Sequence, residues 1–80
     1  SEEVVVYPNP FYVDFKIAEE GVNKYQILDF NGNLVLEEAL NPDTGIYQVY
    51  LPHLDFGMYF LRLYREDGEI LEKKIFKMTY

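Results

Sequence analysis

The sequence predicts an all-β domain, an immunoglobulin-like antiparallel β-sandwich of about seven short strands. Three observations lead to this prediction. Aromatic residues make up 18% of the chain and accompany many β-branched residues, a composition that favours strands. Apolar and polar residues alternate in several short runs, and turn signals separate these runs by roughly 8–12 residues. A small closed barrel fits the same pattern, but seven strands in 80 residues match the immunoglobulin-like layout better.

The first strand is expected at residues 4–7, a β-branched run. It ends at Pro8, Asn9 and Pro10, where two prolines remove two backbone donors and restrict the chain to turn or extended geometry. We therefore expect these three residues to form a corner. Residues 11–17 then alternate between apolar and polar side chains, which predicts a second, half-buried strand.

The next pair of strands is expected at residues 24–30 and 34–36. Asn31 and Gly32 lie between them and predict a hairpin with a two-residue turn. The segment that follows contains Pro42 and two further turn residues, so it predicts a loop.

The last three strands are expected at residues 46–51, 57–65 and 70–78. The final two form a hairpin around Asp67 and Gly68, a pair that favours a type I′ turn with positive φ at both central positions. In the first arm of this hairpin alternate residues point to opposite faces, because the side-chain period of a strand is two.

Charge is distributed unevenly along the chain. The net charge of −7 argues against a nucleic-acid-binding module, which presents a basic face to phosphate. Residues 70–80 nevertheless carry Lys73, Lys74 and Lys77 against Glu72, a sum of +2, so the remainder carries −9. Lysines on an edge strand deter aggregation, and they also suit a recognition surface; both interpretations remain open.

Catalytic and metal-binding patterns are missing from the sequence. There is no cysteine, and the one histidine, His53, lies in an expected loop without a nucleophile motif nearby. Residues 29–33 resemble the start of a calcium loop, but Leu34 and Leu40 stand where such a loop needs Gly and Glu. We expect no enzyme activity, no metal and no cofactor.

A carbohydrate-binding surface is a second hypothesis. Exposed tyrosines stack on sugar rings, although in a small sandwich they more often pack the core with the hydroxyl reaching water. The candidates are Tyr12, Tyr47, Tyr50 and Tyr64. They support an alternative function, an immunoglobulin-like module that binds carbohydrate or acts in adhesion.

Four motifs occur in order along the chain. They are Tyr7-Pro8-Asn9-Pro10-Phe11; Asp29-x-x-Gly32-x-x-Val35; Leu51-x-x-Leu54-x-x-Gly57-x-Tyr59-Phe60-Leu61; and Gly68 followed by Lys73-Lys74-Ile75-x-Lys77. Together they resemble the type A C-terminal sorting domain of the type IX secretion system, also called the Por secretion system C-terminal domain. The resemblance extends from about Val4 to Lys77.

The resemblance implies a non-catalytic secretion signal formed by residues 1–80 as one domain. The implied passenger is an upstream protein that reaches the periplasm of a Gram-negative bacterium and then crosses the outer membrane. The implied partners are the outer-membrane translocon, a shuttle protein and a cell-surface sortase that removes the domain, leaving the cargo secreted or on the cell surface. No nucleic acid and no small-molecule substrate is expected. Because the chain starts with Ser1, we also expect it to be a fragment of a larger secreted protein.

The resemblance and the strand pattern assign two groups of site residues. For translocon recognition we expect the last strand to present Lys73, Lys74, Ile75 and Lys77. Residues with a structural role are expected to be Pro8, Asn9, Pro10, Asp29, Gly32, Gly57, Tyr59 and Gly68. Gly57 is expected to provide a positive φ or a close backbone approach, with Tyr59 packing behind it.

Overall fold

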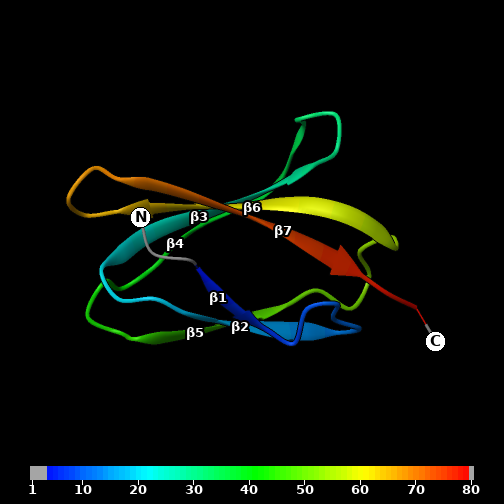
Figure 1. Cartoon of the computed structure of the whole chain (residues 1–80), viewed down its shortest axis with the longest axis horizontal. Coiled ribbons are helices and arrows are strands. Elements are labelled where there is room, and N and C mark those ends of the chain that lie inside the picture. Colours follow the sequence, from blue (N-terminus) through cyan, green and yellow to red (C-terminus); the bar gives the residue numbers. More distant parts are fainter. Residues whose placement is uncertain (1–3, 80) are drawn as a thin grey trace.

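The computed structural model describes residues 4–79, and Ser1 and Tyr80 lie outside this range. The described residues form two antiparallel β-sheets packed face to face, which confirms the predicted all-β sandwich (Figure 1). None of them belongs to a helix long and apolar enough to cross a membrane.

Residues 4–79 contain seven strands. In chain order they are β1 (Val5–Tyr7), β2 (Asp14–Ala18), β3 (Val22–Asp29), β4 (Leu34–Ala39), β5 (Ile46–Tyr50), β6 (Gly57–Arg65) and β7 (Ile70–Lys77). The first sheet has the order β1-β2-β5, and the second sheet has the order β4-β3-β6-β7. The sheet of β1, β2 and β5 thus faces the sheet of β3, β6 and β7, as in immunoglobulin-like sandwiches, and β4 extends the second sheet beside β3.

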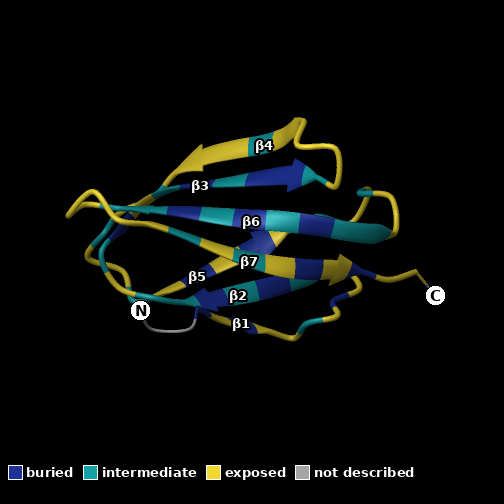
Figure 2. Ribbon diagram, turned by 45° about the horizontal axis from the view of Figure 1, so that its top comes forward, coloured by how far each residue is buried: buried dark blue, intermediate teal, exposed yellow. Residues whose placement is uncertain are grey.

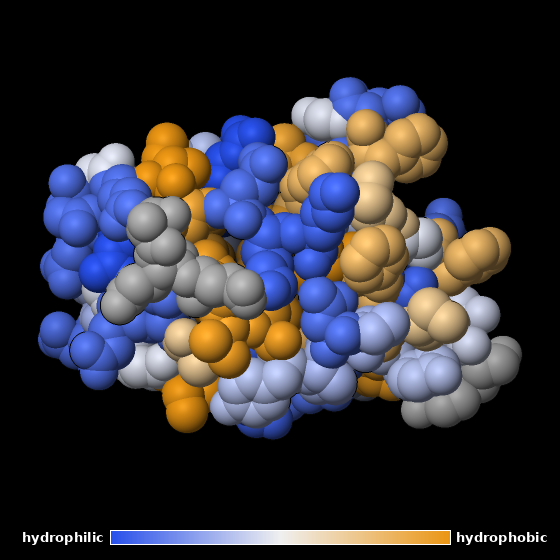
Figure 3. All heavy atoms as spheres, in the orientation of Figure 1, coloured by the Kyte–Doolittle hydropathy of each residue, from blue (hydrophilic) through white to orange (hydrophobic). Residues whose placement is uncertain are grey.

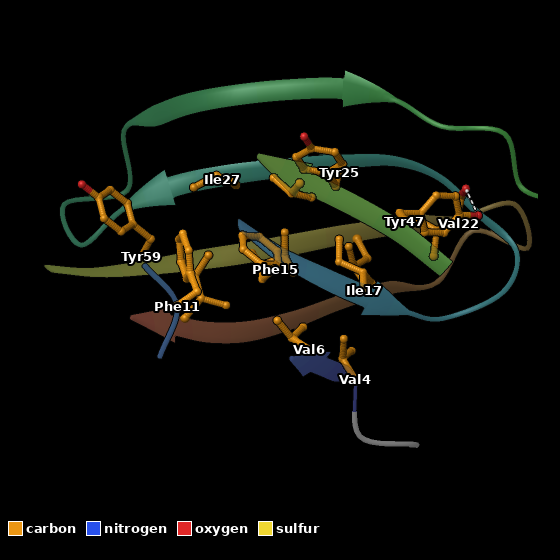
Figure 4. Packing of buried hydrophobic residues seen from close by; sticks show 14 residues of the cluster. Val4, Val6, Phe11, Phe15, Ile17, Val22, Tyr25, Ile27, Tyr47 and Tyr59 are labelled. Carbon is orange, nitrogen blue, oxygen red and sulfur yellow. Dashed lines mark hydrogen bonds between the residues drawn. The ribbon is translucent and has the colours of Figure 1, made fainter. Parts of the chain in front are cut away.

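Alternate side chains of both sheets fill the space between the layers. Phe15 and Ile17 point inward from β2, and Leu61 and Leu63 do so from β6; all four are fully buried. Their cluster also includes Val4, Val6, Phe11, Val22, Tyr25, Ile27, Tyr47, Val49, Tyr59 and Ile75 (Figure 4). The period of two predicted from the sequence therefore separates the core from the two outer faces.

The two hairpin turns differ from the prediction of a two-residue turn. The amide of Gly68 donates to the Arg65 carbonyl over 3.0 Å, and the Arg65 amide donates to the Glu69 carbonyl over 2.9 Å. Gly68 has a positive φ of 95°. Asp67 does not have a positive φ, because within residues 4–79 only glycines do. A type I′ turn is therefore wrong here; the loop has three residues and ends on a left-handed glycine.

The β3–β4 turn repeats this arrangement. The Gly32 amide donates to the Asp29 carbonyl, and the Asp29 amide donates to the Asn33 carbonyl, each over 2.9 Å. Gly32 has φ 86°, so the two-residue turn predicted at Asn31 and Gly32 is again a three-residue loop.

The predicted second strand, residues 11–17, is shorter than expected. β2 begins at Asp14, and Phe11 instead forms an isolated parallel bridge with Lys77 of β7. The Phe11 ring still packs against Phe15, with ring centroids 4.7 Å apart in an edge-to-face arrangement. Phe11 thus joins the first layer to the edge of the second, a long-range contact that alternation alone does not reveal.

Candidate functional site

The lysine-bearing strand β7 forms one edge of the second sheet and pairs with β6. Its residues alternate between two faces. Leu71, Lys73, Ile75 and Lys77 face the inside of the sandwich, whereas Ile70, Glu72, Lys74 and Phe76 are exposed on the outer face. The four residues expected to take part in recognition are therefore distributed over both faces of one strand.

Lys77 and Ile75 lie beneath the surface. The Lys77 residue is 4% exposed, and Ile75 is fully buried. The Lys77 ammonium donates to the Met78 carbonyl over 3.1 Å and lies 6.0 Å from the centroid of the Phe11 ring. Lys73 is half-buried on the same face. Of the three lysines of β7, only Lys74 is exposed, and the Lys77 ammonium lies against the end of the strand.

Lys74 lies within the outer face of the second sheet. Its cross-strand neighbour is Phe60, and the next pair toward the end of β7 is Met58 with Phe76. Within residues 4–79 no carboxylate forms an ion pair with Lys74. Its ammonium group is thus a positive charge at the border of an apolar surface.

The free side of β7 is covered near its end by Asn9. The Asn9 side-chain amide donates from Nδ2 to the Lys74 carbonyl over 3.0 Å, and its Oδ1 accepts from the Phe76 amide over 3.0 Å. These are the bonds that a neighbouring strand would make. Asn9 lies between two cis peptide bonds, Tyr7–Pro8 and Asn9–Pro10.

The backbone of Phe11 continues this cover. Its amide donates to the Phe76 carbonyl over 2.9 Å, and its carbonyl accepts from the Met78 amide over 2.8 Å. With Asn9, it satisfies the outward backbone groups of β7 from the Lys74 carbonyl to the Met78 amide. The prolines of residues 8–10 lie at the corner between β1 and this contact.

Tyr59, which belongs to the third sequence motif, forms a polar contact at the start of β6. It is 8% exposed, and its hydroxyl donates to the Asp55 carbonyl over 2.8 Å. This is the arrangement known as a tyrosine corner in immunoglobulin-like sandwiches. Burial raises the pKa of Tyr59, and the charges of Asp55 and Asp29 raise it further. From the sequence we predicted only that Tyr59 packs behind Gly57, and this prediction missed the hydrogen bond. The position of Tyr59, four residues after Asp55 in the preceding loop, was the signal that could have indicated it.

Gly57 begins β6 with φ 140°, a backbone conformation that residues with a side chain rarely adopt. A Cβ atom at this position would meet no described atom within 4 Å. Gly57 is therefore required for its backbone angle and not for close approach of a neighbour.

Asp29 organises the β3–β4 turn. Its Oδ1 accepts from the amides of Asn31 and Asn33, both over 2.9 Å. The bonds to Asn33 and Asn31 lower the pKa of Asp29, so this carboxylate stays charged at neutral pH. In the other hairpin, the carboxylate of Asp67 accepts from the Glu69 amide over 2.9 Å.

An apolar surface occupies the end of the second sheet where β6 begins and β7 ends. Its outward side chains come from three strands of this sheet and from the adjoining loops, and they lie around the buried Leu28: Phe30, Leu34, Phe56, Met58, Phe60 and Phe76. We call this set the apolar end. In Figure 3 light-orange, moderately hydrophobic atoms lie on the right of the view, beside and below the projecting β3–β4 turn.

The four candidate sugar-stacking tyrosines do not form one platform. Tyr47 is buried, and its hydroxyl donates to the Val22 and Asn41 carbonyls. Tyr50 is 66% exposed on the outer face of the first sheet, whereas Tyr64 lies on the outer face of the second sheet. Tyr12 is exposed in the segment before β2.

His53 is exposed in the loop between β5 and β6. The described part of the chain contains no group of three or more acidic, histidine or cysteine residues placed to hold a metal ion.

Comparison with known families identifies the sandwich further. The model of the secretion system C-terminal sorting domain matches residues 5–77, and the chain belongs to this family. The family acts as a C-terminal sorting signal of the type IX secretion system, which directs proteins to the cell surface or out of the cell; it is non-catalytic.

A solved structure shares the fold. The crystal structure of CopC from Methylosinus trichosporium OB3b aligns with a TM-score of 0.56 and 24% identity, over 95% of this chain and 90% of that one. No curated protein matches the chain. At this identity the likeness concerns the fold alone.

Proposed function

We propose that the domain is the address of a passenger protein attached upstream. In this proposal the passenger reaches the periplasm, the outer-membrane translocon binds the domain, a shuttle protein collects the cargo, and a sortase cleaves upstream of the domain. The cargo is then released or stays on the cell surface of a Gram-negative bacterium. Membership of the sorting-domain family over residues 5–77 is the observation that carries this proposal.

The recognition surface in this proposal is the outer face of β7 together with its covered edge. Lys74 is exposed beside Phe76 and has no ion-pair partner in the described range. A positive charge beside an apolar surface offers a receptor both steering and burial. We assign direct contact to Lys74; Lys73 is half-buried on the inner face and contributes its charge at the edge of the strand.

Ile75 and Lys77, the other two residues expected to take part in recognition, act from the inner face of β7. Ile75 is fully buried, and Lys77 binds the Met78 carbonyl from the inner face. Both fix the position of β7 against Phe11, and through it the position of Lys74. In this proposal their replacement reduces export by displacing the strand.

A secretion assay tests the proposal. Residues 2–80 are fused behind a periplasm-directed fluorescent reporter and expressed in a bacterium with the type IX system and in a translocon-deficient sibling. We expect the reporter outside the competent strain only, with the domain removed. Reporter retained in the periplasm of both strains would refute the proposed function.

Single substitutions separate contact from support. Lys74→Gln should reduce export while leaving the unfolding free energy unchanged, because its ammonium makes no described ion pair. Lys77→Gln should reduce both. Lys16→Gln is the matched control: it removes the same charge from the outer face of the first sheet, on β2, and should leave export at the level of the unmodified domain. Equal export of the Lys74 and Lys16 variants would contradict the assignment.

A further inference from the structure

A pocket of about 350 Å³ opens at the apolar end, between the β3–β4 turn and the start of β6. Its lining consists of Asp29, Phe30, Asp55, Phe56, Gly57, Met58 and Tyr59. We call it the Phe30–Phe56 pocket, because these two phenyl groups are 69% and 73% exposed. Two large aromatic side chains left in water on one small domain indicate a contact surface.

The pocket has negative charge and no cation of its own. Asp29 and Asp55 are its two charged lining residues, and neither lysine nor arginine lines it. The carboxylate of Asp29 is held by the turn amides and stays ionised. Asp55 is exposed, and its backbone carbonyl, not its carboxylate, accepts the Tyr59 hydroxyl. The Asp55 carboxylate is therefore available to a ligand.

The opposite end of the second sheet has an acidic hollow that contains an arginine. A hollow of about 390 Å³ is lined by Glu20, Asp43, Arg65 and Glu66, among others. Arg65 supplies a cation there, and its ion-pair partners are Glu19, Asp67 and Glu69, which do not line the hollow. The Phe30–Phe56 pocket has the carboxylates and lacks the arginine.

Gly57 is one of the residues that line the pocket. Apart from its two chain neighbours, no described atom lies within 4 Å of a Cβ built at Gly57, so there is open space beside this residue. A flat group entering this space would lie among two phenyl side chains and a carboxylate. Guanidinium is planar, stacks on aromatic faces and pairs with carboxylates, which ammonium does less well.

We propose that the Phe30–Phe56 pocket receives an arginine side chain from a partner polypeptide, whose neighbouring apolar residues cover the apolar end. The overall charge of the domain, −7, favours a basic partner. The apolar side chains beside the pocket, such as Met58 and Phe60, extend the contact, since one exposed ion pair contributes little.

The test is a titration of the ¹⁵N-labelled 80-residue chain, followed by amide chemical shifts. The probe is the peptide acetyl-Gly-Leu-Arg-Leu-Gly-amide, and the control peptide has citrulline, the uncharged isostere, in place of arginine. We expect saturable chemical-shift changes confined to residues 29–34 and 55–60. The citrulline peptide should bind about 2- to 5-fold more weakly than the arginine peptide, as expected for loss of one cation–π contact. Equal binding of the two peptides, shifts elsewhere, or no saturable shift would overturn the proposal.

Two variants locate the site. Phe56→Ala should weaken binding of the arginine peptide by about 2- to 5-fold. Asp55→Asn should reduce, without abolishing, the preference for arginine over citrulline, because Asp29 and the two phenyl groups remain, and it should retain the Tyr59 bond and a folded spectrum. Tyr50→Ala, which removes a similarly exposed ring from the first sheet, should bind as the unmodified chain does. Equal losses in the Phe56 and Tyr50 variants would refute the assignment.

This inference does not depend on export. Binding is measured on the isolated chain, so failure of the reporter to leave the periplasm would refute the proposed function and leave the pocket intact. Absence of peptide binding together with normal export would refute the pocket proposal and leave the proposed function intact.

Discussion

The side chain of Asn9 and the backbone of Phe76 are joined by a hydrogen bond of 3.0 Å although they are 67 residues apart in the chain. The same amide group reaches the Lys74 carbonyl. One side chain thereby replaces a strand at the edge of β7, where open backbone groups would otherwise invite pairing with another chain.

Replacing Asn9 by Ala should lower the free energy of unfolding by about 1–2 kcal/mol, because two hydrogen bonds of about 0.5–1.5 kcal/mol each are lost and water partly replaces them. Urea denaturation followed by circular dichroism measures the change. Asn31→Ala is the control, since its backbone amide, not its side chain, makes the described bond. A smaller loss for Asn9 than for Asn31 would contradict the role of Asn9 at the edge.

Replacing Tyr59 by Phe removes the hydroxyl that bonds to the Asp55 carbonyl. The ring stays in the core, so the expected loss is that of one part-buried hydrogen bond, about 0.5–1.5 kcal/mol of unfolding free energy. Thermal unfolding should show a lower midpoint than the unmodified domain. Tyr50→Phe, which removes a hydroxyl from a ring that is 66% exposed, should leave the midpoint unchanged. Identical unfolding midpoints for the two variants would refute a stabilising role of the hydrogen bond from Tyr59 to the Asp55 carbonyl.

Gly57→Ala should destabilise the domain by about 1–3 kcal/mol, the cost of holding a residue with a side chain in a sparsely populated conformation. The cost is conformational, because a Cβ at Gly57 meets no described atom within 4 Å. Gly45→Ala provides the control: no positive φ is recorded there, and its Cβ would make an ordinary contact of 3.6 Å with Glu20. Denaturant titration of both variants distinguishes them, and a larger effect at Gly45 would contradict this account.

Stability should fall as the pH rises from about 10 to 12. Burial, with a smaller contribution from Glu38, raises the pKa of Tyr25 from 10.0 to about 12. Over this interval the unfolded chain loses the Tyr25 proton and the native chain keeps it, which favours unfolding by at most about 3 kcal/mol. Below pH 10 both states are neutral at this residue, so its contribution is constant.

The measurement for Tyr25 is the unfolding free energy against pH for the unmodified domain and for Tyr25→Phe. The variant should lose less stability between pH 10 and 12, although Tyr47 and Tyr59, whose pKa values are also raised, retain part of the dependence. Parallel curves for the two proteins would show that Tyr25 does not titrate as stated.

Much of the architecture could be predicted from local patterns. Alternation over residues 57–65 places Leu61 and Leu63 in the core, and glycines mark both hairpin loops. The turn type could not be predicted, because an Asp-Gly pair suits a two-residue turn and a three-residue loop with a bulge equally well. The difference between the two lies in the hydrogen bonds that the neighbouring residues make.

The candidate site was harder to predict, for two physical reasons. The lysines of β7 share a charge but not a face, and the period of two that places Lys77 beside Ile75 inside the sandwich was already present in the sequence. The contact of Asn9 with β7 has no such local sign, since a side chain that substitutes for a strand leaves no periodicity.

The parallel contact of Phe11 with β7 also determines how the domain responds to force. The segment before Phe11 and the strand β7 run in the same direction at this point (Figures 1 and 2). If the chain before Pro8 and the chain after Met78 are pulled apart, the bonds from Phe11 to Phe76 and to Met78 are loaded in shear and must break together. Because β1 (Val5–Tyr7) lies before Pro8 and pairs with β2, a pull on the N-terminal side loads this pairing as well, and the Phe11 contact adds a second, sheared connection between the N-terminal segment and the last strand.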